Sequence, residues 1–409
     1  MPRILPFQAL RYSLERAGPL ERLVAPPYDV VNEEERRRLL RQSPHNIVRL
    51  TLAEPGEPDF YGRVGATLRS WQKEGVLQKD SHPSFYLLQQ KFPWKGRTIT
   101  RNGFFALIDL RDEKDVVRHE ITFDKYRGER TRLLSETFAN LEPVFFLYED
   151  SQMLLEEALK SATPLHTISF YEEEVSLFAV SPESPLGILC KSLAKEKVFV
   201  ADGHHRFGAS CDFFHKNPSM APHFAMVYFA NMADPNLLIL PTHRFVEASF
   251  SLGALLQKAE PYFSFYACDD PLQLLSMLES SDRCAFGFFA EGKAFLMKLR
   301  DFLKVSHFIP ENRCESWRTL DVVILHYVVM KLFFDLNPDA NFFYDHQPSI
   351  LLKRMEDKGH GAIFFLRSTE ISALRDISLA SEVMPPKSTF FYPKIPSGLL
   401  ISSYDSSIS

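Results

Sequence analysis

The stretch VFVADGHHRFGAS, residues 198–210, places a dense polar cluster between two regular elements. Residues 198–200 are apolar and β-forming, which predicts a buried strand, and residues 207–214 have the pattern of a helix. Between them stand Asp202, Gly203, two histidines and Arg206. Any fold of this chain must therefore end a buried strand and begin a helix within a few residues, around a glycine.

A strand, a tight turn and the start of a helix together form a binding site for anions. The first-turn N–H groups of a helix have no partner within the helix, and its dipole leaves positive charge there. Gly203 has no Cβ, so a phosphate can approach the backbone closely. Arg206 can hold phosphate oxygens with two hydrogen bonds, and His204 and His205 add further donors. The stretch thus predicts a phosphate site made by these four residues.

Asp202 does not fit simple anion binding, because its charge repels a phosphate. Three roles stay open: it holds a metal ion, orients a histidine, or takes a proton from an attacking hydroxyl. The alternative is a purely structural role, in which Asp202 caps the helix and the histidines and Arg206 are solvated at the surface. We favour a functional site because four titratable side chains crowd one turn after a buried strand. A metal site held by the protein alone is not expected, since no HxxxH motif or carboxylate triad accompanies the histidines.

Three further segments carry candidate residues. In RHEITFDKYRGERTR (118–132), Glu120 at a strand end beside Arg130 is a candidate general base near phosphate, and a surface salt-bridge network fits equally well. In MPPKST, Lys387 can offer an ammonium group to phosphate, although a plain surface loop is the simpler interpretation. In APPYDV, two prolines fix the backbone before Tyr28 and Asp29, which suits a rigid site loop.

Composition bounds the classes of protein to which the chain can belong. Its 409 residues predict two or three domains, and 45% hydrophobic with 24% charged residues is typical of soluble globular proteins. The net charge of -5 gives no sign of binding to nucleic acid or to an anionic membrane, and no apolar stretch is long enough to span a bilayer. Five scattered cysteines without CxxC spacing, and a first segment unlike a signal peptide, predict reduced thiols and a cytoplasmic location.

Mixed strands and helices without a regular βαβ period predict the α+β class. We expect three regions: an N-terminal α+β region (1–114), a phosphate-binding core (115–245) and a C-terminal α+β region (246–409). The predicted elements include an N-cap at Asn32, a strand at 45–52, a helix at 60–75, strands at 84–92 and 101–110, a helix at about 129–140, a hairpin at 284–300 and a helix at 319–334. A loop is expected at 54–59 and a frayed end at 404–409.

Six blocks together resemble a known family. They are APPYDVV (25–31), RHEIT (118–122), VADGHHRFGAS (200–210), NMADPNLLILPTHR (231–244), LDVVILH (320–326) and MPPKSTFFYPKIPSGL (384–399). In this order they resemble the bacterial and archaeal family long catalogued as a domain of unknown function, over nearly the whole chain. Over a shorter span, the DGHHR turn also resembles the free-serine kinases of the ParB/sulfiredoxin-like superfamily.

This second resemblance implies a ParB/sulfiredoxin-like mixed α/β core and a small-molecule kinase acting on free L-serine or a similar alcohol. Glu120 would be the base, and Asp202 would join Gly203, His204, His205 and Arg206 in the phosphate and hydroxyl site. Arg130 and Lys387 are further candidates for phosphate contact. The candidates for substrate contact are His119, Asp29, Tyr28, His243 and Arg244.

The implied donor is pyrophosphate, ADP or ATP, with Mg²⁺, and pyrophosphate would fit the lack of a Walker-type P-loop. The expected partner is a small molecule, with neither nucleic acid nor membrane; a homodimer stays open. Two other functions also stay open: a nucleotide-binding module without catalysis, and a phosphatase or hydrolase. The chain departs from the family at residues 126–130, where Pro-Lys-x-Asp-Arg is usual, and at Glu142, where a serine is usual before Pro143.

Overall fold

The computed structural model describes residues 3–52, 57–160, 162–218, 223–337 and 342–404. Half of the loop expected at 54–59 and most of the frayed end expected at 404–409 lie outside these residues. The chain folds into two compact units. Unit 1 comprises Met1–Arg118, Thr122–Leu237 and Pro393–Ser409, and unit 2 comprises His119–Ile121 and Leu238–Tyr392. The tail of the chain therefore returns to the first unit.

Unit 1 is built on a mixed sheet, which has nine strands among the described residues and the order β6-β11-β8-β12-β5-β4-β10-β9, with β1 also paired to β5. Among the described strand pairs of this sheet, β11–β6 and β12–β8 are the parallel ones and the others are antiparallel. The strands are β1 (Ile4–Leu5), β4 (Phe85–Trp94), β5 (Arg97–Asp109), β6 (Val116–Val117), β8 (Val144–Tyr148), β9 (Pro164–Phe170), β10 (Glu173–Val180), β11 (Val198–Asp202) and β12 (Phe224–Asn231). The two predicted strands at 84–92 and 101–110 form the β4–β5 hairpin, as the sequence indicated.

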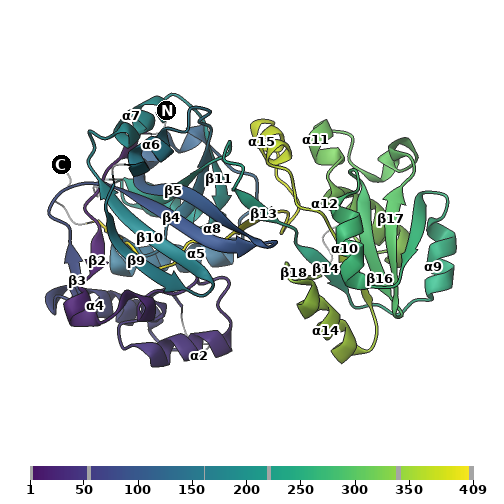
Figure 1. The fold of residues 1–409 in the computed structure, drawn as a ribbon, viewed down its shortest axis with the longest axis horizontal. Coiled ribbons are helices and arrows are strands. Elements are labelled where there is room, and N and C mark those ends of the chain that lie inside the picture. Colours follow the sequence, from purple (N-terminus) through teal and green to yellow (C-terminus); the bar gives the residue numbers. More distant parts are fainter. Residues whose placement is uncertain (1–2, 53–56, 161, 219–222, 338–341, 405–409) are drawn as a thin grey trace. The chain divides into compact units, whose positions relative to one another are not determined.

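One face of this sheet packs against helices to form the main core of unit 1. Alternating residues of the strands, such as Phe104, Phe146 and Phe229, are buried there against α6 (Leu154–Lys160), α7 (Pro185–Leu193) and α8 (His204–Lys216). Figure 1 shows α6 and α7 over the sheet. The alternation follows from the two-residue period of a strand, so the next residues along each strand point to the opposite face.

The remaining elements of unit 1 come from the start of the chain, from residues 110–140 and from the tail. The helical ones are α1 (Leu14–Ala17), η1 (Leu20–Arg22), α2 (Glu33–Gln42), α3 (Val48–Thr51), α4 (Phe60–Lys73), η2 (Leu110–Asp115) and α5 (Asp124–Thr137). Two small ladders pair β2 (Leu10–Tyr12) with β3 (Leu77–Lys79), and β7 (Ala139–Asn140) with β21 (Ser402–Ser403). Asn32 caps α2 as predicted, since its side chain accepts a hydrogen bond from the Glu35 N–H.

Unit 2 is built on a second sheet, which has six strands among the described residues and the order β15-β17-β16-β19-β14-β18, beside the ladder β13–β20. Its strands are β13 (Leu238–Leu240), β14 (His243–Val246), β15 (Phe263–Cys268), β16 (Ala285–Ala290), β17 (Lys293–Leu299), β18 (Phe343–Asp345), β19 (Ala362–Phe365) and β20 (Phe390–Tyr392). Its helical elements are α9 (Leu252–Ala259), α10 (Pro271–Glu279), η3 (Phe302–Lys304), η4 (Ser306–Phe308), α11 (Glu315–Arg318), α12 (Asp321–Ile324), η5 (Leu325–Val329), α13 (Met330–Phe334), α14 (Pro348–Lys358) and α15 (Ile371–Leu379). The predicted hairpin at 284–300 is β16–β17.

The mixed helix and strand content is confirmed, and several details differ from expectation. Residues 1–114 and 115–237 share one sheet, because β12 pairs with β5, so the structure does not separate the first two predicted regions. The strand predicted at 45–52 is wrong: α3 stands there, and the side chain of Asn46 accepts from the Val48 N–H at its first residue. The helix predicted at about 129–140 begins earlier, as α5.

Candidate functional site

The turn between β11 and α8 has the strand–glycine–helix form that the sequence predicted. β11 ends at Asp202, and Gly203 stands in the left-handed region with φ of 85° before α8 begins. A Cβ on Gly203 would lie 2.9 Å from Nε of Arg206. Glycine is thus required twice here, once for the backbone conformation and once because the Arg206 side chain folds back over the turn.

Asp202 is held by charged partners on both sides. Its Oδ1 accepts from the Gly203 N–H at 2.8 Å, and its Oδ2 accepts from Nζ of Lys394 at 2.9 Å. Nη2 of Arg206 lies 3.9 Å from Oδ2. Burial by itself raises the pKa of Asp202, but the charges of Lys394 and Arg206 outweigh it and hold this pKa well below its usual range. Asp202 is therefore ionised at neutral pH and a poor proton acceptor.

Arg206 lies inside a ring of acidic and carbonyl groups. Its Nη1 donates to the carbonyl of Pro143, and its side chain is only 11% exposed. Burial lowers the pKa of Arg206, while the charges of Glu142, Asp202 and Asp29 raise it, and the net shift is upward. The guanidinium thus stays charged and is fixed beside the first turn of α8.

Glu142 ties two distant segments of the sequence to this turn. Its Oε1 accepts from the Tyr28 N–H at 3.1 Å and from the Ser397 hydroxyl at 2.6 Å. Tyr28 belongs to the proline-fixed loop near the start of the chain, and Ser397 belongs to the tail. Glu142 is thus a structural link within the site.

Arg130 on α5 stacks on Tyr28. Its guanidinium carbon lies 4.0 Å from the centre of the Tyr28 ring, and its Nη1 donates to the Thr51 carbonyl at 3.2 Å. Burial raises the pKa of Tyr28 to about 12, although Arg130 and Arg206 oppose this shift. The phenol therefore keeps its proton at neutral pH, so Tyr28 can donate a hydrogen bond but cannot act as a base.

A cavity with about 390 Å³ of empty space, partly open to solvent, lies beside these residues, between α5, α8 and the start of β8. Its charged lining, among the described residues, consists of Arg130, Arg206 and Glu142. The other lining residues are apolar or neutral: Leu133, Leu134, Ala139, Asn140, Leu141, Val144 and Ser210. Two guanidinium groups against one carboxylate give the cavity a positive balance, which favours an anionic ligand.

Neither histidine of the turn lines this cavity, whereas Arg206 does. Nε2 of His205 accepts from the Phe123 N–H at 3.0 Å, and its ring stacks on Phe123. His204 is 2% exposed and does not line the cavity. His205 thus supports the start of α5, and phosphate contact by either histidine stays a prediction.

Five predicted site residues belong to unit 2. The His119 carbonyl accepts from the Met384 N–H, so the His119-Glu120 pair is attached to the MPPKST loop. Lys387 is exposed, with φ of 57°, and its carbonyl accepts from Arg244 at 3.1 Å. Nδ1 of His243 accepts from the Leu366 N–H, and burial lowers the pKa of His243 to about 3, so it is neutral.

The structure therefore brings together Asp202, Gly203, Arg206, Arg130 and Tyr28 within unit 1, and the field of Asp29 reaches Arg206. The convergence of Glu120 with this set stays a prediction, since Glu120 belongs to unit 2. Two residues of the unit 1 site were missed, Lys394 and Glu142. Lys394 stands in the MPPKSTFFYPKIPSGL block, where only Lys387 was singled out, so the block itself was the available signal.

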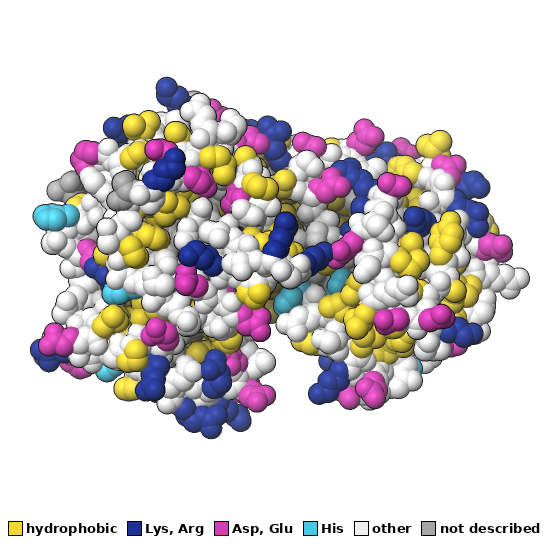
Figure 2. Space-filling model, in the orientation of Figure 1, with side chains coloured by type: hydrophobic (Ala, Val, Ile, Leu, Met, Phe, Trp, Pro, Cys, Tyr) yellow, Lys and Arg dark blue, Asp and Glu magenta, His cyan; other side chains and the backbone are white. Residues whose placement is uncertain are grey.

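The described residues contain no group of three or more His, Cys, Asp or Glu side chains arranged to hold a metal ion. No helix in the described part of the chain is both long and apolar enough to cross a membrane. Figure 2 shows Lys and Arg side chains interspersed with Asp and Glu over the visible surface.

Comparisons with known proteins give one family. Residues 4–323 match the family described as "Protein of unknown function (DUF1015)". No curated protein matches the chain. Among solved structures, a conserved hypothetical protein from Pyrococcus furiosus is 12% identical, with 73% of this chain and 95% of that chain covered and a TM-score of 0.36.

A free serine kinase in complex with AMP is 12% identical, with 70% of this chain and 86% of that chain covered and a TM-score of 0.35. SbnI with a C-terminal truncation from Staphylococcus aureus is 7% identical, with 75% of this chain and 90% of that chain covered and a TM-score of 0.38. At these scores the likenesses assign no activity to the chain.

Proposed function

The chain belongs to the DUF1015 family of proteins of unknown function, whose match spans residues 4–323, and from this premise we propose that it is a small-molecule kinase. It transfers a phosphoryl group to the hydroxyl of free L-serine or of a similar small alcohol. We also propose that the sheet of unit 1 with α8 is the ParB/sulfiredoxin-like core of this enzyme. The acceptor rests on the resemblance of the DGHHR turn and the His-Glu pair to free-serine kinases.

One observation carries the proposal: Arg130 and Arg206 line the same cavity beside a glycine turn that begins α8. A phosphoryl group carries charge on several oxygens, and arginines can hold these oxygens with paired hydrogen bonds. Phosphoryl transfer requires mainly positioning and charge stabilisation. The unit 1 cavity offers both, because Arg206 is fixed by Pro143 and Arg130 by Tyr28.

A network of Lys394 and Asp202 holds Arg206 in place. Asp202 lies between Lys394 and Arg206, so its carboxylate orients two cations without taking a proton itself. We therefore assign Asp202 a positioning role, and not that of the base. The terminal phosphoryl oxygens of pyrophosphate, ADP or ATP would lie against Arg206 and Arg130, with Tyr28 as a neutral donor.

In the proposed reaction the serine Oγ forms a bond to phosphorus as the bond from phosphorus to the bridging oxygen breaks. The hydroxyl proton passes to the carboxylate of Glu120. The leaving group is inorganic phosphate from pyrophosphate, AMP from ADP, or ADP from ATP. Glu120 is assigned from the resemblance, and its approach to the unit 1 cavity is part of the proposal.

Mg²⁺ would arrive bound to the donor. No three-residue ligand cluster exists in the described residues, and Mg²⁺ commonly uses phosphate oxygens, waters and only one or two carboxylates. When bound, the ion neutralises phosphate charge. Asp29 is exposed and near enough to Arg206 to raise its pKa, so it is the carboxylate best placed to meet such an ion.

The test is a matrix of donors against acceptors. Purified protein with Mg²⁺ is incubated with pyrophosphate, ADP or ATP, and with serine, threonine or glycerol, and products are followed by ³¹P NMR. We expect phosphoserine from at least one donor, and a large loss of its formation in Glu120→Gln. Glu34→Gln, an exposed change on α2, is the matched control and should keep wild-type turnover.

Two other outcomes would replace this proposal. Release of phosphate at the same rate with and without an acceptor indicates a hydrolase. Nucleotide binding by calorimetry without turnover under any condition indicates a binding module. Turnover that Glu120→Gln leaves intact removes Glu120 as the base but keeps the kinase.

A further inference from the structure

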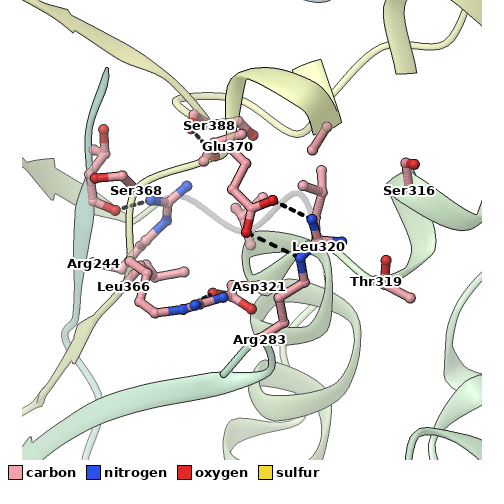
Figure 3. Close-up of a pocket in the computed structure, with 15 residues that line it drawn as sticks. Arg244, Arg283, Ser316, Thr319, Leu320, Asp321, Leu366, Ser368, Glu370 and Ser388 are labelled. Atoms are coloured by element: carbon pink, nitrogen blue, oxygen red, sulfur yellow. Dashed lines mark hydrogen bonds and ion pairs between the residues drawn. The ribbon is translucent and has the colours of Figure 1, made fainter. Parts of the chain in front are cut away.

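We propose that unit 2 contains a second anion site, a cavity around Arg244 that binds a small molecule bearing an oxyanion, either phosphate or carboxylate. The cavity has about 470 Å³ of empty space and is partly open to solvent. Figure 3 shows side chains from several elements, among them Arg244, Arg283, Glu370 and Ser368, around one space. This inference rests on the residues of unit 2 and does not depend on the kinase proposal.

The charged lining of this cavity is unbalanced. Among the described residues it has three arginines and two carboxylates. Arg283 pairs with Glu370, and Nε of Arg367 donates to Asp321 at 3.1 Å. Each acid is thus matched by an arginine, and the charge of Arg244 remains.

Arg244 has only neutral partners in the described part of the chain. It is 1% exposed, and its partners are the carbonyls of Thr242, Pro386 and Lys387 and Nε2 of His326. These contacts use four of its five N–H groups and leave one on Nη1. Burial lowers the pKa of Arg244 to about 10, so it still carries its charge at neutral pH. A buried charge without a counter-ion is costly, and an anionic ligand relieves that cost.

Two hydroxyl groups of the lining are available to the same ligand. In the described residues, the side-chain hydroxyls of Thr242 and Ser368 make no hydrogen bond to protein. The other lining hydroxyls already donate to protein acceptors: Ser316 to Asp376, Thr319 to Glu315, Thr369 to Ser388, and Ser388 to Pro385. The cavity therefore offers an unmatched positive charge and two free hydroxyl donors, which is the donor set that an oxyanion accepts.

A helical segment that includes a π-helical stretch supplies one partner of Arg244. Residues 321–334 run through α12, η5 and α13, and η5 is a π-helical stretch that contains His326. Nε2 of His326 accepts from Nε of Arg244 at 3.4 Å, which fixes the guanidinium from behind. Such π-helical insertions occur frequently at functional sites, because they turn one side chain out of register with its neighbours.

A local reporter makes this site testable apart from unit 1. The chain has three tryptophans, and Trp317 on α11 follows Ser316 of the cavity wall, whereas Trp71 and Trp94 belong to unit 1. Protein labelled with 5-fluorotryptophan is titrated with inorganic phosphate, with acetate, and with sodium chloride at equal ionic strength, by ¹⁹F NMR. We expect the Trp317 resonance to shift and saturate with phosphate or with acetate, and not with chloride.

Variants decide whether the cavity is responsible. Arg283→Gln leaves the charge of Glu370 unmatched in the cavity wall, and this negative charge should raise the half-saturating concentration of the oxyanion roughly tenfold. Lys353→Gln, an exposed change on α14 away from the cavity, is the matched control and should leave the titration unchanged. Arg244→Gln should abolish the shift of the Trp317 resonance. Because the Arg244 side chain also holds the MPPKST loop, a second variant is needed. Thr242→Val removes only an unbonded hydroxyl and should also weaken binding.

The proposal is overturned if Trp317 does not respond to either oxyanion in folded protein. It is equally overturned if Arg283→Gln and Thr242→Val titrate like Lys353→Gln. The arm that saturates first identifies the group, phosphate or carboxylate, that the ligand carries.

Discussion

Replacing Gly203 by alanine tests the geometry of the unit 1 site most selectively. The backbone of Gly203 has φ of 85°, and a left-handed conformation costs a residue with a Cβ about 1 to 2 kcal/mol. The new Cβ would also lie 2.9 to 3.1 Å from the Arg206 guanidinium, so this group must move. Its bond to Pro143 and its approach to Asp202 would weaken, at a further cost of about 1.5 to 3 kcal/mol.

Gly96 supplies a matched control in the same unit. It has φ of 76° in the β4–β5 turn, and nothing lies within 4 Å of its ideal Cβ position. Gly96→Ala therefore carries the backbone penalty without the displacement of an arginine. We expect it to lower the free energy of unfolding by about 1 to 2 kcal/mol, measured by urea denaturation, and to leave ligand affinity unchanged.

The same two variants are then titrated with pyrophosphate by calorimetry. Gly203→Ala should lose more stability than Gly96→Ala, and its affinity should fall by about tenfold or more. If the two variants lose the same stability and bind pyrophosphate equally well, Arg206 is not held over the turn as described, and the site argument fails.

Three further predictions follow from the buried ionisable groups. Lys394→Met should lower the free energy of unfolding by about 2 kcal/mol at pH 7. The folded pKa of Asp202 is depressed, so the Asp202–Lys394 ion pair stabilises the protein above the unfolded pKa of about 4. The difference in stability between variant and wild type, measured by urea unfolding, should therefore shrink as the pH falls below that value. His243 has a folded pKa of about 3, so wild-type stability should fall by up to roughly 1.4 kcal/mol per pH unit as the pH drops from about 6.5 toward 3, and His243→Asn should remove that slope. Tyr28→Phe should weaken pyrophosphate binding a few-fold in calorimetry without changing its pH dependence between 6 and 9, because the pKa of Tyr28 is about 12; a new pH dependence in that range would contradict its assigned role.

Local signals in the sequence predicted the turn at Gly203 correctly. Apolar β-forming residues before it and a helical pattern after it leave few other arrangements, and the hairpins at Lys95-Gly96 and Glu291-Gly292 follow the same logic. The strand predicted at 45–52 failed because a short apolar run does not distinguish a strand from a buried helical turn. There the Asn46 side chain accepts from the N–H of Val48, the first residue of α3, and this local hydrogen bond favours a helical turn.

The contacts that complete the site depend on segments far apart in the chain. Lys394 reaches Asp202 across 192 positions, and Ser397 reaches Glu142 across 255. No periodicity or spacing in the sequence predicts such pairs, because they form only when the tail of the chain folds back into unit 1. Residue types in the turn could suggest an anion site, but not which cation would neutralise Asp202.

The sequence also grouped residues that the fold assigns to different units. Lys387 was chosen for its ammonium group, yet its backbone carbonyl is what contacts Arg244. Arg244 was placed with the kinase substrate residues; it lines the cavity of unit 2, and its contact with the kinase substrate stays a prediction. Both differences arise because sequence reasoning assigns roles to side-chain types before it is known where the backbone carries them.

The central claim is that Arg130 and Arg206 together bind a phosphoryl group. It is tested most directly by a crystal structure of the protein with methylenediphosphonate, a non-hydrolysable analogue of pyrophosphate. We predict a phosphonate group within hydrogen-bonding distance of both guanidiniums, in the cavity between α5 and α8. A diphosphonate bound elsewhere, with this cavity filled only by water, would contradict the account.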